Sequence, residues 1–258
     1  MTTAVAPSLD KALRLAATTG HLLVASDFDG TLAEIVSRPE LAVAHPDAIT
    51  ALAELAALRV TDAAVISGRS RSDLVGLTGN PPGVVLVGGH GSEWGAEWGG
   101  GLELTGEQRT ALDAAEALVE EVAAGHPGSL VEPKRAAVVL HTRGIDDPAA
   151  AERAASAVRD AAVDIPGVAV LDGKRVVELT VTPETKGTAL AGLRQRMGAT
   201  AVVFIGDDMT DETAFEVLGS TDIGIRVGSG RTVALHRVGT VEGVAGLLQR
   251  LLELRRSR

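Results

Sequence analysis

Short apolar runs alternate with amphipathic stretches along both ends of the chain. Residues 22–25 are all apolar, as expected for a strand that is buried on both faces of a parallel sheet. Residues 47–58 instead repeat apolar positions at helical spacing. This alternation predicts an α/β fold with a doubly wound parallel sheet. The other strands predicted for this sheet are 61–66, 84–87, 201–205 and 223–227, and the other helices are 8–19 (capped by Ser8), 71–77, 186–197, 211–218 and 241–254.

The middle of the chain has a different pattern. Two long amphipathic stretches predict helices, and four short apolar runs predict strands, the last two forming a hairpin at Asp172-Gly173. We therefore expect a compact α+β domain at residues 104–180, inserted between two parts of the core at residues 1–103 and 181–258. The predicted helices of the insertion are 107–124 and 148–162, and its predicted strands are 129–131, 136–142, 168–171 and 176–180.

Two aspartates follow the first predicted strand. Asp27 and Asp29 stand one residue apart and precede Gly30 and Thr31. Ligands of open α/β sheets bind at the carboxyl ends of the strands, so both carboxylates are placed where chemistry is expected. One can attack a phosphorus atom while the other handles the proton of the leaving group. Because Asp and Gly are also common turn residues, a plain turn is the alternative.

Two further polar side chains stand at the edges of predicted elements. Ser67 follows the second strand, where its hydroxyl could bind a phosphoryl oxygen, although Ser67-Gly68-Arg69 also suits an ordinary turn. Lys186 opens a predicted helix, where its charge opposes the helix dipole. Such a position indicates a bound anion, with a solvated lysine as the alternative.

Four acidic residues follow the buried strand at 201–205. Asp207, Asp208, Asp211 and Glu212 lie within six positions and would repel one another without a cation. Oxygen ligands of this kind suit Mg²⁺. An acidic helix start would explain Asp211 and Glu212 through the helix dipole, but it does not explain Asp207 and Asp208.

Composition narrows the classes of partner. The chain has 24 basic and 34 acidic residues, a formal charge of −10, which disfavours binding to nucleic acid or to anionic membranes. It has no Cys, so disulfides and thiolate metal sites are excluded. The first residues lack the basic start and continuous apolar run of a signal peptide, and no apolar stretch approaches 18 residues. A cytoplasmic, monomeric protein is the expectation.

The order of these motifs (DxDGT, Ser, Lys, GDDxTDE) resembles that of the haloacid-dehalogenase (HAD) superfamily. The resemblance implies that Asp27 is a nucleophile that forms an aspartyl-phosphate. It implies that Asp29 protonates the leaving oxygen and then activates water. Ser67 and Lys186 would hold the transferred phosphoryl group.

The same resemblance implies a Mg²⁺ ion. Its ligands would be the Asp27 carboxylate, the backbone carbonyl of Asp29 and the Asp207 carboxylate, with Asp211 supporting the ion directly or through water. The residues that would support the motifs are Gly30, Thr31, Gly68 and Asp208.

The insertion lies at the position of a C2-type cap, and several segments resemble trehalose-6-phosphate phosphatases in particular. These segments are DFDGTLAEI at 27–35, SGR at 67–69, GGHGSE at 88–93 and GDDMTDETAF at 206–215. The resemblance implies hydrolysis of trehalose 6-phosphate to trehalose and phosphate, a step of trehalose biosynthesis. The residues given a substrate-binding role are Arg69, His90, Glu132, Lys134, Arg143, Lys174 and Glu178. For the cap residues, a solvated charged face is the alternative, and for His90 an ordinary loop histidine.

Three other functions remain open. A related C2-capped phosphatase would act on sucrose 6-phosphate or glucosylglycerol phosphate, and the core motifs do not distinguish it. A phosphomannomutase-like enzyme would isomerise hexose phosphates without net phosphate release. A sugar-phosphate sensor, or a non-catalytic partner of a synthase, would require a damaged site, yet Asp27, Asp29, Lys186 and Asp207 are all present.

Overall fold

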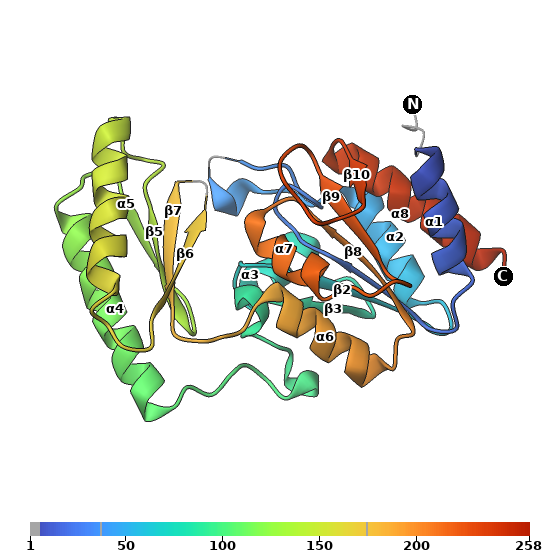
Figure 1. The fold of residues 1–258 in the computed structure, drawn as a ribbon, viewed down its shortest axis with the longest axis horizontal. Coiled ribbons are helices and arrows are strands. Elements are labelled where there is room, and N and C mark those ends of the chain that lie inside the picture. Colours follow the sequence, from blue (N-terminus) through green and yellow to red (C-terminus); the bar gives the residue numbers. More distant parts are fainter. Residues whose placement is uncertain (1–5, 37, 174) are drawn as a thin grey trace. The chain divides into compact units, whose positions relative to one another are not determined.

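The computed structural model describes residues 6–36, 38–173 and 175–258. The chain forms two compact units. The core unit consists of Met1–Gly99 and Glu184–Arg258, and the inserted unit consists of Gly100–Pro183. Figure 1 shows the elements of both units in the colours of the sequence. None of the helices in the described part of the chain has the length and hydropathy that crossing a bilayer requires.

A six-stranded parallel sheet forms the centre of the core unit, in the order β10-β9-β8-β1-β2-β3. Strand β1 lies between β2 and β8, with Ser26 opposite both Val65 and Ile205. The carboxyl ends of these three strands therefore lie level at one edge. The strands are β1 (Leu22–Ser26), β2 (Thr61–Ile66), β3 (Val84–Val87), β8 (Ala201–Gly206), β9 (Ile223–Val227) and β10 (His236–Val238).

Helices cover both faces of this sheet. Side chains alternate along β1, so Leu22 and Val24 pack into one hydrophobic cluster while Leu23 and Ala25 pack into another. The first cluster is closed by α1 (Pro7–Ala17), α2 (Pro46–Ala56), α3 (Arg71–Thr78) and α8 (Val241–Arg256). The second is closed by α6 (Lys186–Met197) and α7 (Met209–Glu216). The expected doubly wound architecture is confirmed.

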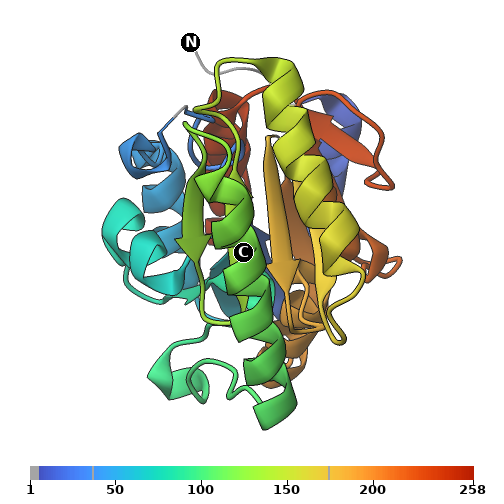
Figure 2. The same ribbon diagram turned by 90° about the vertical axis from the view of Figure 1, so that its left-hand side faces the viewer.

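A four-stranded antiparallel sheet, in the order β4-β5-β7-β6, forms the inserted unit. Its strands are β4 (Leu130–Pro133), β5 (Ala137–His141), β6 (Ala169–Gly173) and β7 (Val176–Thr180). Helices α4 (Gly106–Ala124) and α5 (Pro148–Ala162) pack side by side on one face of it, as Figure 2 shows. Val138 and Leu140 point to these helices, and Val139 and His141 point to the other face.

Several features differ from the expectations. The hairpin of the insertion does not turn at Asp172-Gly173, because both residues belong to β6 and pair with β7. Ser8 does not cap α1, because Pro7 occupies the first turn, where its missing N–H costs nothing, and the cap residue is Ala6. Helix α7 begins at Met209 rather than at residue 211, with Asp208 as its cap. Strand β10 was not predicted. The short 3₁₀ helices η1 (Pro39–Leu41), η2 (Gly89–Gly91) and η3 (Ala96–Trp98) were not predicted either.

Candidate active site

Asp27 continues β1 beyond its last paired residue. Its N–H donates to the carbonyl of Ile205 at 2.8 Å, and its side chain is buried. Gly30 follows with φ +79°, and a Cβ there would lie 2.1 Å from Asp207 Oδ2. Glycine is therefore required for the Asp27 and Asp207 loops to approach. Thr31 is buried nearby, and its hydroxyl has no hydrogen-bond partner among the described residues.

Lys186 is buried at the start of α6, with 3% of its surface exposed. Its Nζ donates to Asp27 Oδ1 at 2.6 Å and to Asp211 Oδ1 at 2.7 Å. Burial by itself would lower the pKa of Lys186, but the charges of Asp211 and Asp27 outweigh it and raise that pKa above its usual range. The ammonium is held as a cation by two carboxylates, which rules out a solvated lysine.

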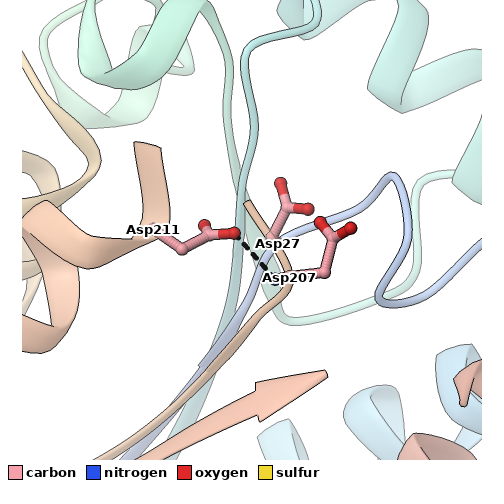
Figure 3. A group of neighbouring side chains, drawn as sticks. All are labelled: Asp27, Asp207 and Asp211. Carbon is pink, nitrogen blue, oxygen red and sulfur yellow. Dashed lines mark hydrogen bonds between the residues drawn. The ribbon is translucent and has the colours of Figure 1, made fainter. Parts of the chain in front are cut away.

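Asp211 connects Lys186 to the loop after β8. Its Oδ2 accepts the backbone N–H of Asp207 at 2.9 Å and of Asp208 at 2.8 Å, while Oδ1 accepts from Lys186. Figure 3 shows the carboxylate reaching from α7 to the backbone of Asp207. Since both oxygens accept hydrogen bonds, Asp211 fixes the loop that carries Asp207. The Asp208 side chain caps α7 instead and accepts from the N–H of Met209.

Asp27, Asp207 and Asp211 form a compact acidic cluster (Figure 3). Each offers an oxygen within 4.8 Å of the others. Burial, with the charges of Asp211 and Asp208, raises the pKa of Asp207 to about 7. Burial also raises the pKa of Asp27 well above its usual range, against the opposing charge of Lys186. One ammonium stands against three carboxylates here, so the cluster has an excess of negative charge that suits a divalent cation.

Glu212 is not part of this cluster, although it belongs to the same acidic run. Its Oε1 accepts from Arg226 Nη1 at 3.1 Å, and its Oε2 accepts from the Thr232 hydroxyl and the Val233 N–H. Arg226 also donates to the carbonyl of Asp208 at 2.8 Å. Glu212 and Arg226 therefore tie the segment after β9 to the start of α7.

Asp29 points to Arg69. Arg69 Nε donates to Asp29 Oδ2 and Nη2 donates to Oδ1, both at 2.6 Å. Sequence reasoning gave Arg69 a substrate-binding role and missed this pair.

Ser67 is buried just after the end of β2. Its N–H donates to the Val87 carbonyl of β3, and its Oγ accepts the Arg69 N–H at 3.3 Å.

His90 lies in η2 with φ +54°, and its N–H donates to the Ser67 carbonyl at 2.9 Å. Its ring lies against Gly68, where a Cβ would meet ring atoms at 2.5 Å. Gly68 is thus needed for the histidine to pack beside the Ser67 turn.

A second group of charged side chains lies on the helix-free face of the inserted sheet. Lys134 Nζ donates to Glu178 Oε2 at 2.6 Å, with both side chains about nine-tenths buried, and His141 Nε2 pairs with Glu132 Oε2 at 2.6 Å. The hydrogen bond from His141 lowers the pKa of Glu132, against the effect of burial. His141 had no assigned role, although it faces the same side of β5 as Val139.

Two further residues of the insertion were expected to bind the substrate. Arg143 is half-buried just beyond β5, and the expected residue Lys174 lies outside the described residues.

A model of the trehalose-phosphatase family matches residues 25–243. The chain belongs to this family. The match begins just before Asp27 and ends beyond the Asp207 loop, so it spans the acidic cluster and the charged group of the inserted sheet.

This member of the trehalose-phosphatase family has relatives that are longer than the chain itself. A bifunctional trehalose-6-phosphate synthase/phosphatase of Thermoproteus tenax is 37% identical over 250 residues, which cover 95% of this chain and 34% of the relative. A trehalose-phosphate phosphatase of Mycobacterium marinum is 35% identical over 87% of this chain and 60% of its own length. The chain thus spans about a third to three-fifths of these two relatives.

Solved structures of the trehalose-phosphatase type share the fold. The C-terminal domain of the C. albicans trehalose-6-phosphate phosphatase superposes with a TM-score of 0.80 at 22% identity, over 98% of each chain. A trehalose-6-phosphate phosphatase related protein gives 0.71 at 26% identity, over 91% of this chain and 99% of that one. The expected HAD-like α/β fold is confirmed.

Proposed function

We propose that this chain is a Mg²⁺-dependent phosphatase that hydrolyses trehalose 6-phosphate through an aspartyl-phosphate on Asp27. The observation that carries the proposal is the buried Lys186, held between Asp27 and Asp211 inside an acidic cluster. Such an arrangement orients a carboxylate and leaves a site for a cation and a phosphoryl group. Membership of the trehalose-phosphatase family supports the substrate.

Asp27 acts as the nucleophile. Lys186 holds Asp27 Oδ1, so Oδ2 attacks phosphorus while the bond from phosphorus to the sugar oxygen breaks. Asp29 takes up a proton from solvent before this step and gives it to the departing oxygen. Water then attacks the aspartyl-phosphate, Asp29 takes a proton from it, and phosphate leaves. Lys186 and the Ser67 hydroxyl hold the phosphoryl oxygens in both steps.

The acidic cluster fits Mg²⁺. Its donors are all carboxylate oxygens, which this ion prefers. Burial, and next the charges of Asp211 and Asp208, raise the pKa of Asp207, and a cation would relieve the repulsion part of that shift. Asp27 and Asp207 would hold the ion together with the carbonyl of Asp29, and Asp211 would act by fixing the loop. When bound, Mg²⁺ neutralises charge on the phosphoryl oxygens.

The charged face of the inserted sheet is the proposed sugar-binding surface. Glu132, Lys134 and Glu178 present paired charges, and charged groups make the stronger hydrogen bonds to hydroxyls. Arg143 and Lys174 are proposed to join them from the inserted unit, and Arg69 and His90 are the candidates in the core unit.

The deciding experiment measures phosphate release with Mg²⁺ from trehalose 6-phosphate, sucrose 6-phosphate, glucose 6-phosphate and mannose 1-phosphate. We expect preference for trehalose 6-phosphate, loss of release in EDTA, and loss of release in Asp27→Asn. An Asp62→Asn variant, which changes an aspartate on β2 away from the cluster, serves as the matched control. Preference for another sugar phosphate would overturn the substrate and keep the chemistry, whereas release by Asp27→Asn at the wild-type rate would overturn the nucleophile.

Lys134→Ala is expected to impair sugar binding more than chemistry. The substitution removes one partner of a nearly buried carboxylate and one donor of the proposed surface. We expect KM for trehalose 6-phosphate to rise about tenfold or more, with a smaller change in release from a small aryl phosphate. Equal losses on both substrates would contradict a sugar-binding role.

A further inference from the structure

The Asp29 carboxylate is fully engaged by one arginine. Arg69 donates from Nε and Nη2 to the two oxygens of Asp29, each at 2.6 Å, in the bidentate geometry of a guanidinium–carboxylate pair. The proposed chemistry requires Asp29 to face the leaving oxygen of the substrate. Both of its oxygens are directed at Arg69 instead, so this pair has to open before Asp29 can act.

The guanidinium is the fixed member of the pair. Its Nη1 donates to the Pro39 carbonyl at 3.0 Å, and the group lies over the ring of Phe28 at 5.4 Å. The Arg69 side chain is 13% exposed, whereas the Asp29 side chain is 37% exposed. Because the guanidinium is held by the Pro39 carbonyl and the Phe28 ring and the carboxylate is more open to solvent, opening the pair moves Asp29 and leaves the guanidinium in place.

Arg69 is linked to two residues of the proposed phosphoryl-transfer site. The carboxylate that Arg69 holds, Asp29, follows the proposed nucleophile Asp27 by two residues. Arg69 also follows Ser67 by two residues and donates its backbone N–H to the Ser67 hydroxyl. A guanidinium fork matches the oxygens of a phosphate as well as those of a carboxylate.

We propose that Arg69 is an exchange site, which Asp29 occupies in the free protein and a phosphoryl group occupies in the complex. Displacement of the carboxylate from the guanidinium frees Asp29 to turn to the leaving oxygen. Substrate arrival thereby releases the proton-transfer group. The proposal rests on the roles given above to Asp27 and Asp29, and it makes Arg69 a positioning residue for Asp29.

The test is a double-mutant cycle on the binding of inorganic phosphate, measured by calorimetry with Mg²⁺ on the full chain. The proteins are wild type, Asp29→Asn, Arg69→Gln and the double variant. If phosphate competes with Asp29 for Arg69, Asp29→Asn tightens phosphate binding about tenfold when Arg69 is present, and much less in the Arg69→Gln background. Asp29→Ala, which removes both acceptors, is expected to tighten it at least as much.

A general effect of charge gives a different result. Loss of one negative charge near an anion site would tighten phosphate binding equally in both backgrounds, and that outcome overturns the exchange. So does the absence of phosphate binding in all four proteins. The matched control is the cycle of Asp10→Asn and Arg14→Gln, a second Arg–Asp pair at 2.7 Å on α1, for which no change in phosphate binding is expected.

The same cycle separates this proposal from the proposed function. Phosphate binding requires no turnover, so it can support the exchange even if trehalose 6-phosphate is not the substrate. In turnover assays, Arg69→Lys keeps the charge but loses the planar fork. We expect Arg69→Lys to raise KM and to lower kcat together. If Arg69 had a purely structural role, the effects of Asp29→Asn and Arg69→Gln on phosphate binding would be additive.

Discussion

Lys186 compensates the buried charges of Asp27 and Asp211 in the core unit. Lys186→Met would leave Asp27 and Asp211 buried without their cation. Breaking a buried pair in this way costs about 3–5 kcal/mol, so urea unfolding of the metal-free variant should shift to much lower denaturant, and phosphate release should be lost. Lys11→Met, on the exposed face of α1, is the matched control and should change neither property. An unchanged unfolding midpoint for Lys186→Met would contradict the buried pair.

Asp207 makes the metal-free protein sensitive to pH. Its pKa is about 7 in the folded chain, whereas an aspartate exposed to water has a pKa of 3.8, so the folded protein binds more protons between these values. The free energy of unfolding therefore falls as pH rises from about 4 to about 7, by up to about 4 kcal/mol from this group. Asp207→Asn should flatten part of that decline, and Mg²⁺ should offset it in the wild type.

The measurement for Asp207 is urea unfolding at pH 5 and pH 8, with and without Mg²⁺. Asp113→Asn, an exposed change on α4, is the control and should follow the wild type. The assignment is wrong if Asp207→Asn loses as much stability as the wild type over this range.

Among the elements, α7 depends on Glu212 for its connection to the segment after β9. Glu212→Gln weakens the bonds to Arg226 and to the Val233 N–H, so amide hydrogen exchange at residues 228–235 should accelerate about tenfold. Glu216→Gln changes an exposed residue on the same helix and should leave this exchange unchanged. Equal exchange rates in both variants would show that the segment is held by other contacts.

Hydrophobic pattern was sufficient to predict most elements, for a physical reason. Strands such as β1 and β8 are buried on both faces, so their sequences are almost wholly apolar and stand out. Strand β10 has one apolar residue in three and pairs only with β9 among the described strands, so its sequence carries no such signal. The start of α1 was misplaced because Ser8 resembles a cap, whereas Pro7 already fits the first turn.

The candidate site was predictable only in part. Asp27, Lys186 and Asp207 follow strands or open a helix at one sheet edge, so their convergence could be expected from topology. The pairing of Asp29 with Arg69 depends on side-chain directions beyond the ends of β1 and β2, which neither motif encodes locally. The same holds for Glu212, whose sequence position suggested a place in the acidic cluster.

At the scale of the whole molecule, each unit has its own hydrophobic core. In residues 100–183, two helices pack on a four-stranded sheet, and side chains such as Leu140 and Val158 are buried between the helices and the sheet. We expect these residues to fold alone, with a cooperative urea transition followed by circular dichroism. Leu140→Ala should lower its stability by about 2–5 kcal/mol. A gradual, non-cooperative loss of signal in the isolated unit would contradict the prediction.

The order of the strands has a consequence for synthesis on the ribosome. Strand β1 pairs with β2 on one side and with β8 on the other, and the inserted unit is encoded between β2 and β8. The inserted unit is contiguous, so all its partners have been made by residue 183. The central strand of the core then still exposes an unpaired, largely apolar edge. During synthesis, the inserted unit can therefore be folded while the core sheet is still incomplete. A chaperone would be needed at the edge of β1 that pairs with β8, until β8 emerges.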